Sequence, residues 1–437
     1  MKGFRITPPR IIALSYFGIA LVGALLLELP FARRVPVSFT DSFFTSASAL
    51  YVTGLSSVTT STTWTPFGDA IIALLIQVGG AGITFVTTSF YLLMGRKISL
   101  GARMLIAEDR NFGVHGVVRL MKSILAFSFV FEGAAAFLFM LYFRLVYHYT
   151  WLRAIGISVF HSVSAFNNAG FDLWGNSLES FTNDPFILIL TSLLIIFGGL
   201  GFIVLVELYN FRRTHIVSLH TRIVVRMTAL LLVLGTIFTL LFESYASMRN
   251  LSWPDKILNA WFMSVTTRTA GFDSVSVGHM KEITWFIFII LMFIGASPGS
   301  TGGGIKTTTF YTLIKTAFST ARGSSEIVVG ERSIPQEQGQ RSLVIFLLGI
   351  AVVTGCVMID AALEPGIRLM RIVFEEVSAF GTVGLTTGIT GIVSAPVKWV
   401  LIFTMYVGRI GILTLLISLV QRGQSKVKRI PERILIG

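Results

Sequence analysis

The chain carries one short sequence pattern four times, and the copies are separated by 116, 101 and 113 residues. Each copy has an aromatic residue ten positions before a glycine and a large apolar residue directly after it. Three copies place Ser-Ala six and five positions before the glycine, whereas the third copy has diverged to Val-Thr. The four glycines are Gly54, Gly170, Gly271 and Gly384. Agreement at several fixed offsets predicts one structural unit copied four times.

The composition is typical of a polytopic membrane protein. Hydrophobic residues make up 53% of the chain and charged residues only 13%, whereas soluble proteins carry about 25% charged residues. A helix needs about 20 apolar residues to cross the hydrocarbon core of a bilayer. Eight stretches reach about that length, at residues 11–31, 67–94, 124–146, 186–209, 223–242, 283–318, 343–363 and 397–420.

A shorter apolar segment separates the two spans of each pair and leads to one of the four glycines. We interpret residues 38–52, 154–168, 256–267 and 367–380 as re-entrant half-helices. The predicted fold is therefore an all-α polytopic membrane protein with eight transmembrane helices and four re-entrant half-helices around a central pore. The predicted units, each a span, a pore loop and a span, cover residues 1–110, 111–215, 216–335 and 336–437.

The distribution of Lys and Arg predicts the orientation of the chain. With a cytoplasmic N-terminus, 22 of the 35 basic residues fall in cytoplasmic segments, as the positive-inside rule requires. We therefore expect a multi-pass protein of the cell membrane with both termini in the cytoplasm and the glycine loops open to the outside. The net charge of +13 is then a membrane feature, and nucleic acid is not an expected partner.

The chemistry of the four loops favours a monovalent cation. A half-helix that ends inside the membrane directs its partly negative carbonyl end inward, and a ring of backbone carbonyls can replace the hydration shell of a cation. Glycine permits the backbone torsions that aim these carbonyls at a common axis. The predicted filter consists of Val52, Thr53, Gly54, Asn168, Ala169, Gly170, Thr269, Ala270, Gly271, Thr382, Val383 and Gly384.

Glycine-rich breaks interrupt the second span of each unit 24 to 28 residues after the repeated glycine. Close packing between helices is an alternative explanation for such small residues. The third break, residues 295–304, holds five glycines and a proline and cannot form a regular helix. We predict a gate there that includes Gly295, Pro298, Gly299, Gly302, Gly303 and Gly304. The break has the spacing of a nucleotide-binding loop, but Ile305 stands where that motif needs lysine.

Four charged residues near the repeats are further candidates. Arg409 lies at the level of the breaks and is predicted to hold the gate, because a charge at membrane depth usually faces a cavity. Arg268 is predicted to brace the third loop, with a headgroup contact as the alternative. Asp172 and Asp273 follow their glycines by two residues and are predicted to concentrate cations at the outer mouth, unless they are solvated or helix-capping aspartates.

The sequence shows no catalytic motif. Its six histidines have no metal-ligand spacing, no metal beyond the transported ion is expected, and paired carboxylates or a nucleophile motif are absent. His161 is expected to have a packing or hydrogen-bonding role, and Cys356, the single cysteine, to be a packing residue. We therefore expect a transporter rather than an enzyme.

These motifs resemble the KtrB/TrkH/HKT family of potassium transporters over essentially the whole chain, and are closest to the KtrB/KtrD type. The resemblance rests on residues 52–55, 164–171, 268–272, 304–306, 378–385 and 408–411. It implies a homodimeric potassium uptake subunit in membrane lipid that is often stimulated by Na⁺. It also implies a cytoplasmic KtrA or KtrC ring that binds ATP or ADP and controls the gate, to which Lys306 and Arg409 belong.

One departure from the family is the Leu50-Tyr51 pair, which stands where two threonines are more common. A hydroxyl lost at the inner end of the filter weakens the expected preference for potassium. An alternating-access Na⁺/K⁺ symport carrier is the alternative function, although carriers of this kind usually show two related halves rather than four short units. No organic cofactor is expected in this chain.

Overall fold

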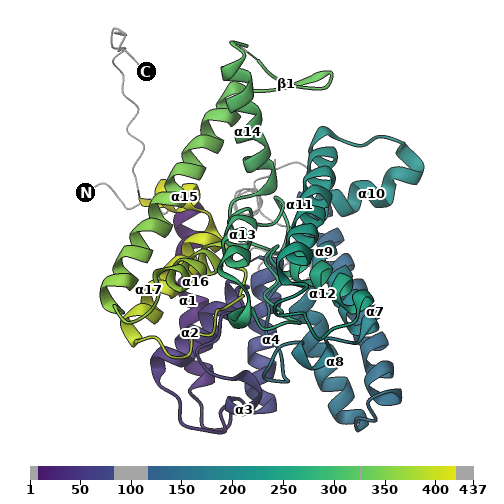
Figure 1. Ribbon diagram of the computed structural model, residues 1–437, viewed down its shortest axis with the longest axis vertical. Helices are drawn as coiled ribbons and strands as arrows, with labels where there is room; N and C mark the ends of the chain where they lie inside the picture. The colour runs from purple at the N-terminus through teal and green to yellow at the C-terminus, as the bar shows by residue number, and fades with distance from the viewer. Residues whose placement is uncertain (1–7, 83–116, 325, 420–437) are drawn as a thin grey trace.

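The computed structural model describes residues 8–82, 117–324 and 326–419, and these residues are mostly helical (Figure 1). The first part holds α1 (Pro8–Leu27), α2 (Phe39–Leu50), α3 (Thr60–Thr63) and α4 (Pro66–Ala81). The second part runs from α7 (Val117–Leu145) to α14 (Thr307–Ala321), and the third from strand β1 (Ile327–Val329) to α18 (Ile412–Leu419). The predicted boundary at residues 110 and 111 lies outside the described residues.

Four helices of the described part are by themselves long and apolar enough to cross a membrane. These long helices are α1, α7, α11 (Leu219–Glu243) and α15 (Gln336–Leu363). Leu14, Phe129 and Leu347 lie on them and are more than half exposed. Apolar side chains exposed along a long helix are expected where the surroundings are lipid rather than water, so the structure is that of a multi-pass membrane protein.

A shorter helix follows each long helix, and we call these four the ring helices. They are α2, α8 (Trp151–Phe166), α12 (Trp253–Thr266) and α16 (Leu369–Gly381). Each packs against the long helix before it and occupies a segment predicted as a half-helix. Serine side chains cap two of them, because Ser38 Oγ accepts from Asp41 N and Ser252 Oγ accepts from Asp255 N, which satisfies otherwise unpaired amides of the first turn.

The helices that follow the ring helices are α4, α9 (Pro185–Leu200), α13 (Glu282–Phe293) and α17 (Ala395–Ile410). Three of them, α9, α13 and α17, are each separated from a further helix by a break within the described residues. The chain bends by 100° between α9 and α10 (Phe202–Thr214), and by 95° between α17 and α18. Gly201 and Gly411 lie at these bends with φ angles of 93° and 89°, which glycine adopts readily. The expected spans 186–209 and 397–420 are therefore bent pairs of helices.

The expected span 283–318 is divided by a longer interruption. Helix α13 ends at Phe293, and α14 begins at Thr307. The non-helical segment between them contains the predicted gate, residues 295–304, and we call residues 294–306 the crossing loop. Beyond α14, β1 pairs antiparallel with β2 (Arg332–Ile334) and leads into α15, at the end of the molecule away from α3 (Figure 1).

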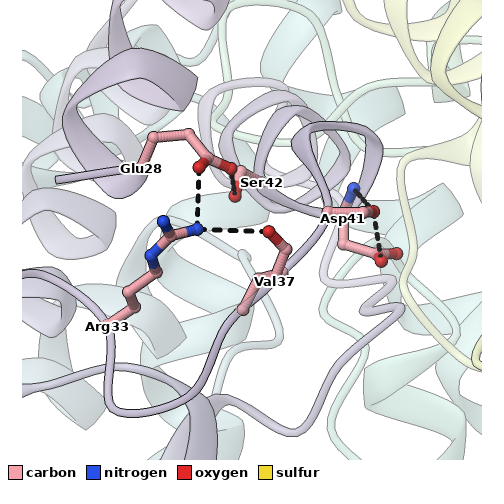
Figure 2. Close-up of polar contacts among 6 residues, drawn as sticks. Glu28, Arg33, Val37, Asp41 and Ser42 are labelled. Atoms are coloured by element: carbon pink, nitrogen blue, oxygen red, sulfur yellow. Dashed lines mark hydrogen bonds and ion pairs between the residues drawn. The ribbon is translucent and has the colours of Figure 1, made fainter. Parts of the chain in front are cut away.

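Polar contacts join the beginning of the chain to its end. Figure 2 shows the Glu28 carboxylate between Arg33 Nη1, at 2.7 Å, and Ser42 Oγ, also at 2.7 Å. These bonds fix the turn from α1 into α2. Asp41, in the first turn of α2, forms a largely buried ion pair of 2.7 Å with Lys398 of α17. Helix α1 also packs against α17 and α18, so the first and last helices of the described chain are neighbours.

Candidate functional site: the glycine ring

The four repeated glycines lie together in one ring, although about a hundred residues separate each from the next in the sequence. A methyl group added to Gly54 would lie 2.6 Å from the Ala169 carbonyl oxygen, and one added to Gly170 would lie 2.8 Å from that of Ala270. Methyl groups on Gly271 and Gly384 would likewise collide with carbonyl oxygens, those of Val383 and Thr53 respectively. Each glycine therefore faces the carbonyl that precedes the next, and the ring closes.

The backbone of the four loops repeats the same torsion pattern. All four glycines have positive φ angles, between 70° and 95°. The residue two positions before each glycine also has a positive φ angle although it has a side chain: 56° at Val52, 59° at Asn168, 71° at Thr269 and 49° at Thr382. Such conformations cost about 1–3 kcal/mol each and persist where the surrounding structure holds them, often at functional sites.

The ends of the ring helices hold these loops in place. The Ser48 hydroxyl accepts from Gly54 N at 3.1 Å, and the Ser378 hydroxyl accepts from Gly384 N at the same distance. Backbone bonds of 2.8 Å run from Thr53 N to Ser48 O and from Val383 N to Ser378 O. The four helices thus end at the ring with their carbonyl ends toward it, where the helix dipoles contribute partial negative charge.

Glycines of the breaks pack directly against the ends of the ring helices. A methyl group on Gly79 or Gly408 would collide with the carbonyl oxygen of Leu50 or Phe380, four residues before the respective ring glycine. Gly198 meets the carbonyl of Phe166 in the same way. Tight packing is therefore the structural role of these three positions, as in the alternative explanation given above.

The crossing loop lies on the side of the ring that faces the helix ends. Gly303 N donates to Thr382 Oγ1 at 2.9 Å, Gly304 N to Gly408 O at 3.3 Å, and Thr301 N to Gly198 O at 3.2 Å. These bonds attach the crossing loop to Thr382 of the fourth ring loop and to glycines of α17 and α9. The loop therefore stands directly beside the positive-φ residues of the ring.

Arg409 connects the crossing loop to another break. Its guanidinium donates to the carbonyl of Thr301 in the loop and to that of Gly79 in α4. Lys306, at the end of the loop, donates from Nζ to the Gly302 carbonyl at 2.7 Å. Both cations thus donate hydrogen bonds to carbonyl oxygens of the non-helical crossing loop.

Arg268 is buried and lies three residues before its ring glycine. It donates from Nη2 to the carbonyl of Gly295 at 3.4 Å, which is the start of the crossing loop. The Nε and Nη1 atoms have no hydrogen-bond partner among the described residues. The side chain therefore braces the crossing loop rather than the carbonyls of its own ring loop.

A cavity of about 360 Å³ lies on the other side of the ring and is lined by all four glycines; we call it the mouth. Asp172 and Asp273 also line it. The Asp172 carboxylate accepts from Trp174 N at 2.8 Å and Gly175 N at 2.5 Å, so it stabilises a local turn. Burial, together with the carboxylates of Glu179 and Asp172, raises the pKa of Asp273 to about 7.

A second cavity, of about 350 Å³, lies next to the crossing loop. Its lining includes Gly299, Gly302, Gly304, Lys306 and Arg409. The ring and the crossing loop therefore lie between two cavities of similar size. This is the arrangement expected of a pore with an internal constriction.

Several buried polar residues behind the ring were not predicted from the sequence. Asn167 Nδ2 donates to Glu132 Oε1 at 2.9 Å and to Gln77 Oε1 at 3.1 Å. The Glu375 carboxylate of α16 accepts from Thr386 Oγ1 at 2.5 Å and Thr387 N at 3.0 Å. A carboxylate inside an apolar segment could have indicated these contacts from the sequence, because a buried charge requires hydrogen-bonding partners.

Two other expectations concern side chains near the ring. Tyr51, the departure from the family pattern, is buried, and its ring lies 6.2 Å from that of Tyr16 and 5.7 Å from that of Tyr406. His161 is buried and shares a hydrogen bond of 2.9 Å with Thr191 Oγ1, consistent with a packing role. The described residues hold no metal-binding group of three His, Cys, Asp or Glu side chains.

Comparisons with known proteins agree with this geometry. The profile of the TrkH family, described as "Cation transport protein", matches residues 10–428. The chain belongs to the TrkH family. Membership places it among cation transporters and confirms the expectation that it is not an enzyme.

The chain is 38% identical to "Ktr system potassium uptake protein B" of Bacillus subtilis (strain 168), with 98% of this chain and 96% of the relative covered. It is 36% identical to "Potassium/sodium uptake protein NtpJ" of Enterococcus hirae, with 99% and 98% covered. The crystal structure of the potassium transporter TrkH from Vibrio parahaemolyticus aligns with a TM-score of 0.74 at 21% identity, over 96% of this chain and 86% of that one. The family resemblance predicted from the motifs is thus confirmed.

Proposed function

We propose that the chain takes up potassium across the cell membrane through a selectivity filter formed by the glycine ring. The observation that carries this proposal is the closure of the ring, in which each repeated glycine meets the carbonyl that precedes the next one. The filter residues are the four triplets predicted above. Their carbonyls replace the water around a monovalent cation, and the four ring-helix ends favour its charge.

The four-unit layout supports this function. In it, each unit contributes a long helix, a ring helix, a loop with the repeated glycine, and a broken second helix. The mouth faces the outside, the cavity beside the crossing loop faces the cytoplasm, and both termini are cytoplasmic. Asp172 and Asp273 line the mouth and raise the local concentration of cations there.

The crossing loop acts as the gate in this proposal. It lies directly beside the ring and is held by Arg409 through two carbonyls that belong to different breaks. Movement of the loop away from the ring opens a path between the two cavities. A cytoplasmic ring of the KtrA or KtrC type, which binds ATP or ADP, controls this movement, and the transporter works as a homodimer with one pore in each protomer.

Sodium stimulates uptake in the proposed function. The printed names of two relatives support the choice of ions, since one is a potassium uptake protein and the other a potassium/sodium uptake protein. An alternating-access symporter would use the same ions. The two mechanisms differ in stoichiometry, because a carrier moves a fixed number of sodium ions with each potassium ion.

Reconstitution into liposomes tests the proposal. Potassium influx driven by a potassium gradient is expected without sodium, and to become faster when sodium is added, with no fixed ratio between the two fluxes. A strict requirement for inward sodium movement would favour the carrier. Absence of potassium flux from correctly folded protein, with the regulatory ring present, would contradict the proposed function.

A further inference from the structure

Three of the four ring helices are attached to the preceding long helix by the same kind of neutral hydrogen bond. In each case a buried serine hydroxyl donates to a backbone carbonyl. The bonds run from Ser46 Oγ to Ala20 O at 2.7 Å, from Ser162 Oγ to Glu132 O at 2.6 Å, and from Ser264 Oγ to Leu232 O at 2.7 Å. Hydroxyl and carbonyl groups do not titrate in the physiological pH range, so these links are independent of pH.

The fourth ring helix, α16, has a carboxyl group at this place. Glu376 stands eight positions before its ring glycine, as Ser46 and Ser162 do before theirs. Glu376 is fully buried, and its side chain lies within hydrogen-bond reach of Asp360 on α15, which is also buried. A pair of carboxyl groups therefore joins α16 to its long helix.

Three of the four carboxyl oxygens of this pair have no hydrogen-bond partner among the described residues. Both carboxyl oxygens of Glu376 and Oδ1 of Asp360 are buried without a hydrogen-bond partner there. The Thr404 hydroxyl lies beside the Glu376 carboxyl group and donates to the Val400 carbonyl at 3.1 Å. Two ionised carboxylates this close repel each other strongly, and such pairs share a proton. A carboxylic acid on one side can donate to the other.

The surroundings add negative charge and no cation. The charged groups that act on the pair are Glu364, at the end of α15, and Glu375 of α16; the Cys356 thiol of α15 lies near both carboxyl groups. Three cations of the packed elements have other partners: Arg371 of α16 lies over the Trp285 ring of α13, Lys398 of α17 pairs with Asp41, and Arg409 of α17 binds the carbonyls of Thr301 and Gly79. No neighbouring positive charge within this described region therefore replaces the shared proton.

A small cavity lies beside Asp360 of the pair. A cavity of about 10 Å³ is lined by Asp360, Glu364 and Glu375, and this volume is about the minimum that holds one water molecule. Glu364 lies at the end of α15 and is partly exposed. A water molecule in this cavity would lie between Asp360 of the pair and Glu364 at the end of α15.

We propose that Asp360 and Glu376 share one proton, and that this proton-dependent link positions the fourth ring helix. The inference rests on the proposed function, because its readout is potassium uptake. When the proton leaves, the two carboxylates repel, α16 shifts against α15, and the fourth loop moves out of register with the other three. The maximal rate of uptake therefore falls as pH rises. Glu376 is a positioning residue, since it lies behind the filter.

The test compares potassium uptake by liposomes that contain wild type or variants over a range of external pH. Glu376→Gln retains a donor toward Asp360 at every pH. We expect the wild type to lose several-fold in maximal rate toward alkaline pH, and Glu376→Gln to keep a nearly constant rate. Ser162→Ala is the matched control, because it removes a neutral link and lowers the rate by a similar factor at all pH values.

Infrared difference spectroscopy supplies a readout that does not depend on transport. The wild type is expected to show a band of a protonated carboxyl group that is lost on alkalinisation and is missing from Glu376→Gln. A wild-type pH profile identical to that of Glu376→Gln would overturn the inference. Absence of the protonated-carboxyl band from the wild type would also overturn it, and this is the result expected if a metal cation rather than a proton lies between the two carboxylates. Failure of the proposed function is distinct, since uptake would then be absent at every pH.

Discussion

The glycine ring and the crossing loop are adjacent regions built on opposite principles. In the ring, four loops of different sequence adopt one backbone pattern, with positive φ at each glycine and two residues before it. On the neighbouring side, two segments of the described chain bend at a single glycine, Gly201 or Gly411, whereas the third unit has a thirteen-residue loop, at residues 294–306. Equivalence suits a ring of ligands around an ion, whereas a single exceptional segment suits a gate.

The largest expected effect comes from breaking the equivalence of the ring. Gly271→Ala places a methyl group against the Val383 carbonyl at a φ of 80°. Strain of about 1–3 kcal/mol corresponds to about 5- to 150-fold in an equilibrium constant, and we expect potassium uptake to fall at least about tenfold. Rubidium or potassium influx into liposomes measures this effect.

The matched control for this variant is Gly156→Ala. Gly156 lies on ring helix α8, and an added methyl group there has no atom within 4 Å. Uptake is expected to remain at the wild-type rate. Equal loss in both variants would show that the ring glycine has no special role.

The second prediction removes the tie between the crossing loop and α4. Arg409→Ala leaves two buried carbonyls without their charged donor, at a cost of about 1–3 kcal/mol each. We expect the loop to be released and the rate of uptake, or its response to sodium, to change about five- to tenfold with the fold intact. Arg341→Ala is the control, because Arg341 lines the same cavity; unchanged kinetics in Arg409→Ala would reject the gate.

A smaller effect is expected from removing the Glu375 carboxylate, which accepts hydrogen bonds from the fourth ring loop and has no counterpart in the other three copies. Glu375 stands nine positions before Gly384, where the other copies have Thr45, His161 and Phe262. Glu375→Gln keeps the size but removes the charge that strengthens the bonds from Thr386 and Thr387. We expect the preference for potassium over sodium to fall about three- to fivefold, from a loss of about 1 kcal/mol, with little change in maximal rate.

Thr45→Val controls for the Glu375 variant. It alters the equivalent position on ring helix α2, where the Thr45 hydroxyl has no partner among the described residues. Competition between potassium and sodium for uptake measures both variants. A similar loss of preference in both would mean that the fourth loop is not specially supported.

The smallest predicted effect concerns the mouth. Because the pKa of Asp273 is raised to about 7, its carboxylate is charged mainly above that pH and neutral below it. The apparent KM for potassium is therefore expected to rise about twofold as pH falls through about 7, at low ionic strength. Asp273→Asn should remove this dependence. Titration of Asp273 changes the apparent KM at acidic pH. The proposed proton link between Asp360 and Glu376 changes the maximal rate at alkaline pH, so the two effects can be separated.

The parts of the ring that could be predicted are those where one residue type is physically required. Glycine at positive φ in contact with a neighbouring backbone cannot be replaced, so it appears in all four copies. The residues two positions earlier share the same torsion but are Val52, Asn168, Thr269 and Thr382, and no common chemistry reveals them. Their conformation is imposed by tertiary contacts.

The bends of the broken helices were only partly predictable. Hydropathy continues through Gly201 and Gly411, so a count of apolar residues describes each bent pair as one span. The glycines in these spans indicated where a bend could occur. A glycine within a helix is also used for close packing, as Gly198 and Gly408 show, so the sequence did not tell the two roles apart. The contact between Arg268 and Gly295 could not be predicted, because it requires two segments to lie close together in space and no local sequence pattern shows this.

The ion pair between Asp41 and Lys398 lies at the contact between the first and last helices of the described chain, and this position bears on local stability. Consecutive parts of the protein are tied by peptide bonds, whereas the junction between the earliest and latest helices depends on side-chain contacts alone. Thermal fluctuation therefore separates the helices most easily at this contact. Amide hydrogen exchange should begin in the helices on its two sides before it reaches the interior of the protein.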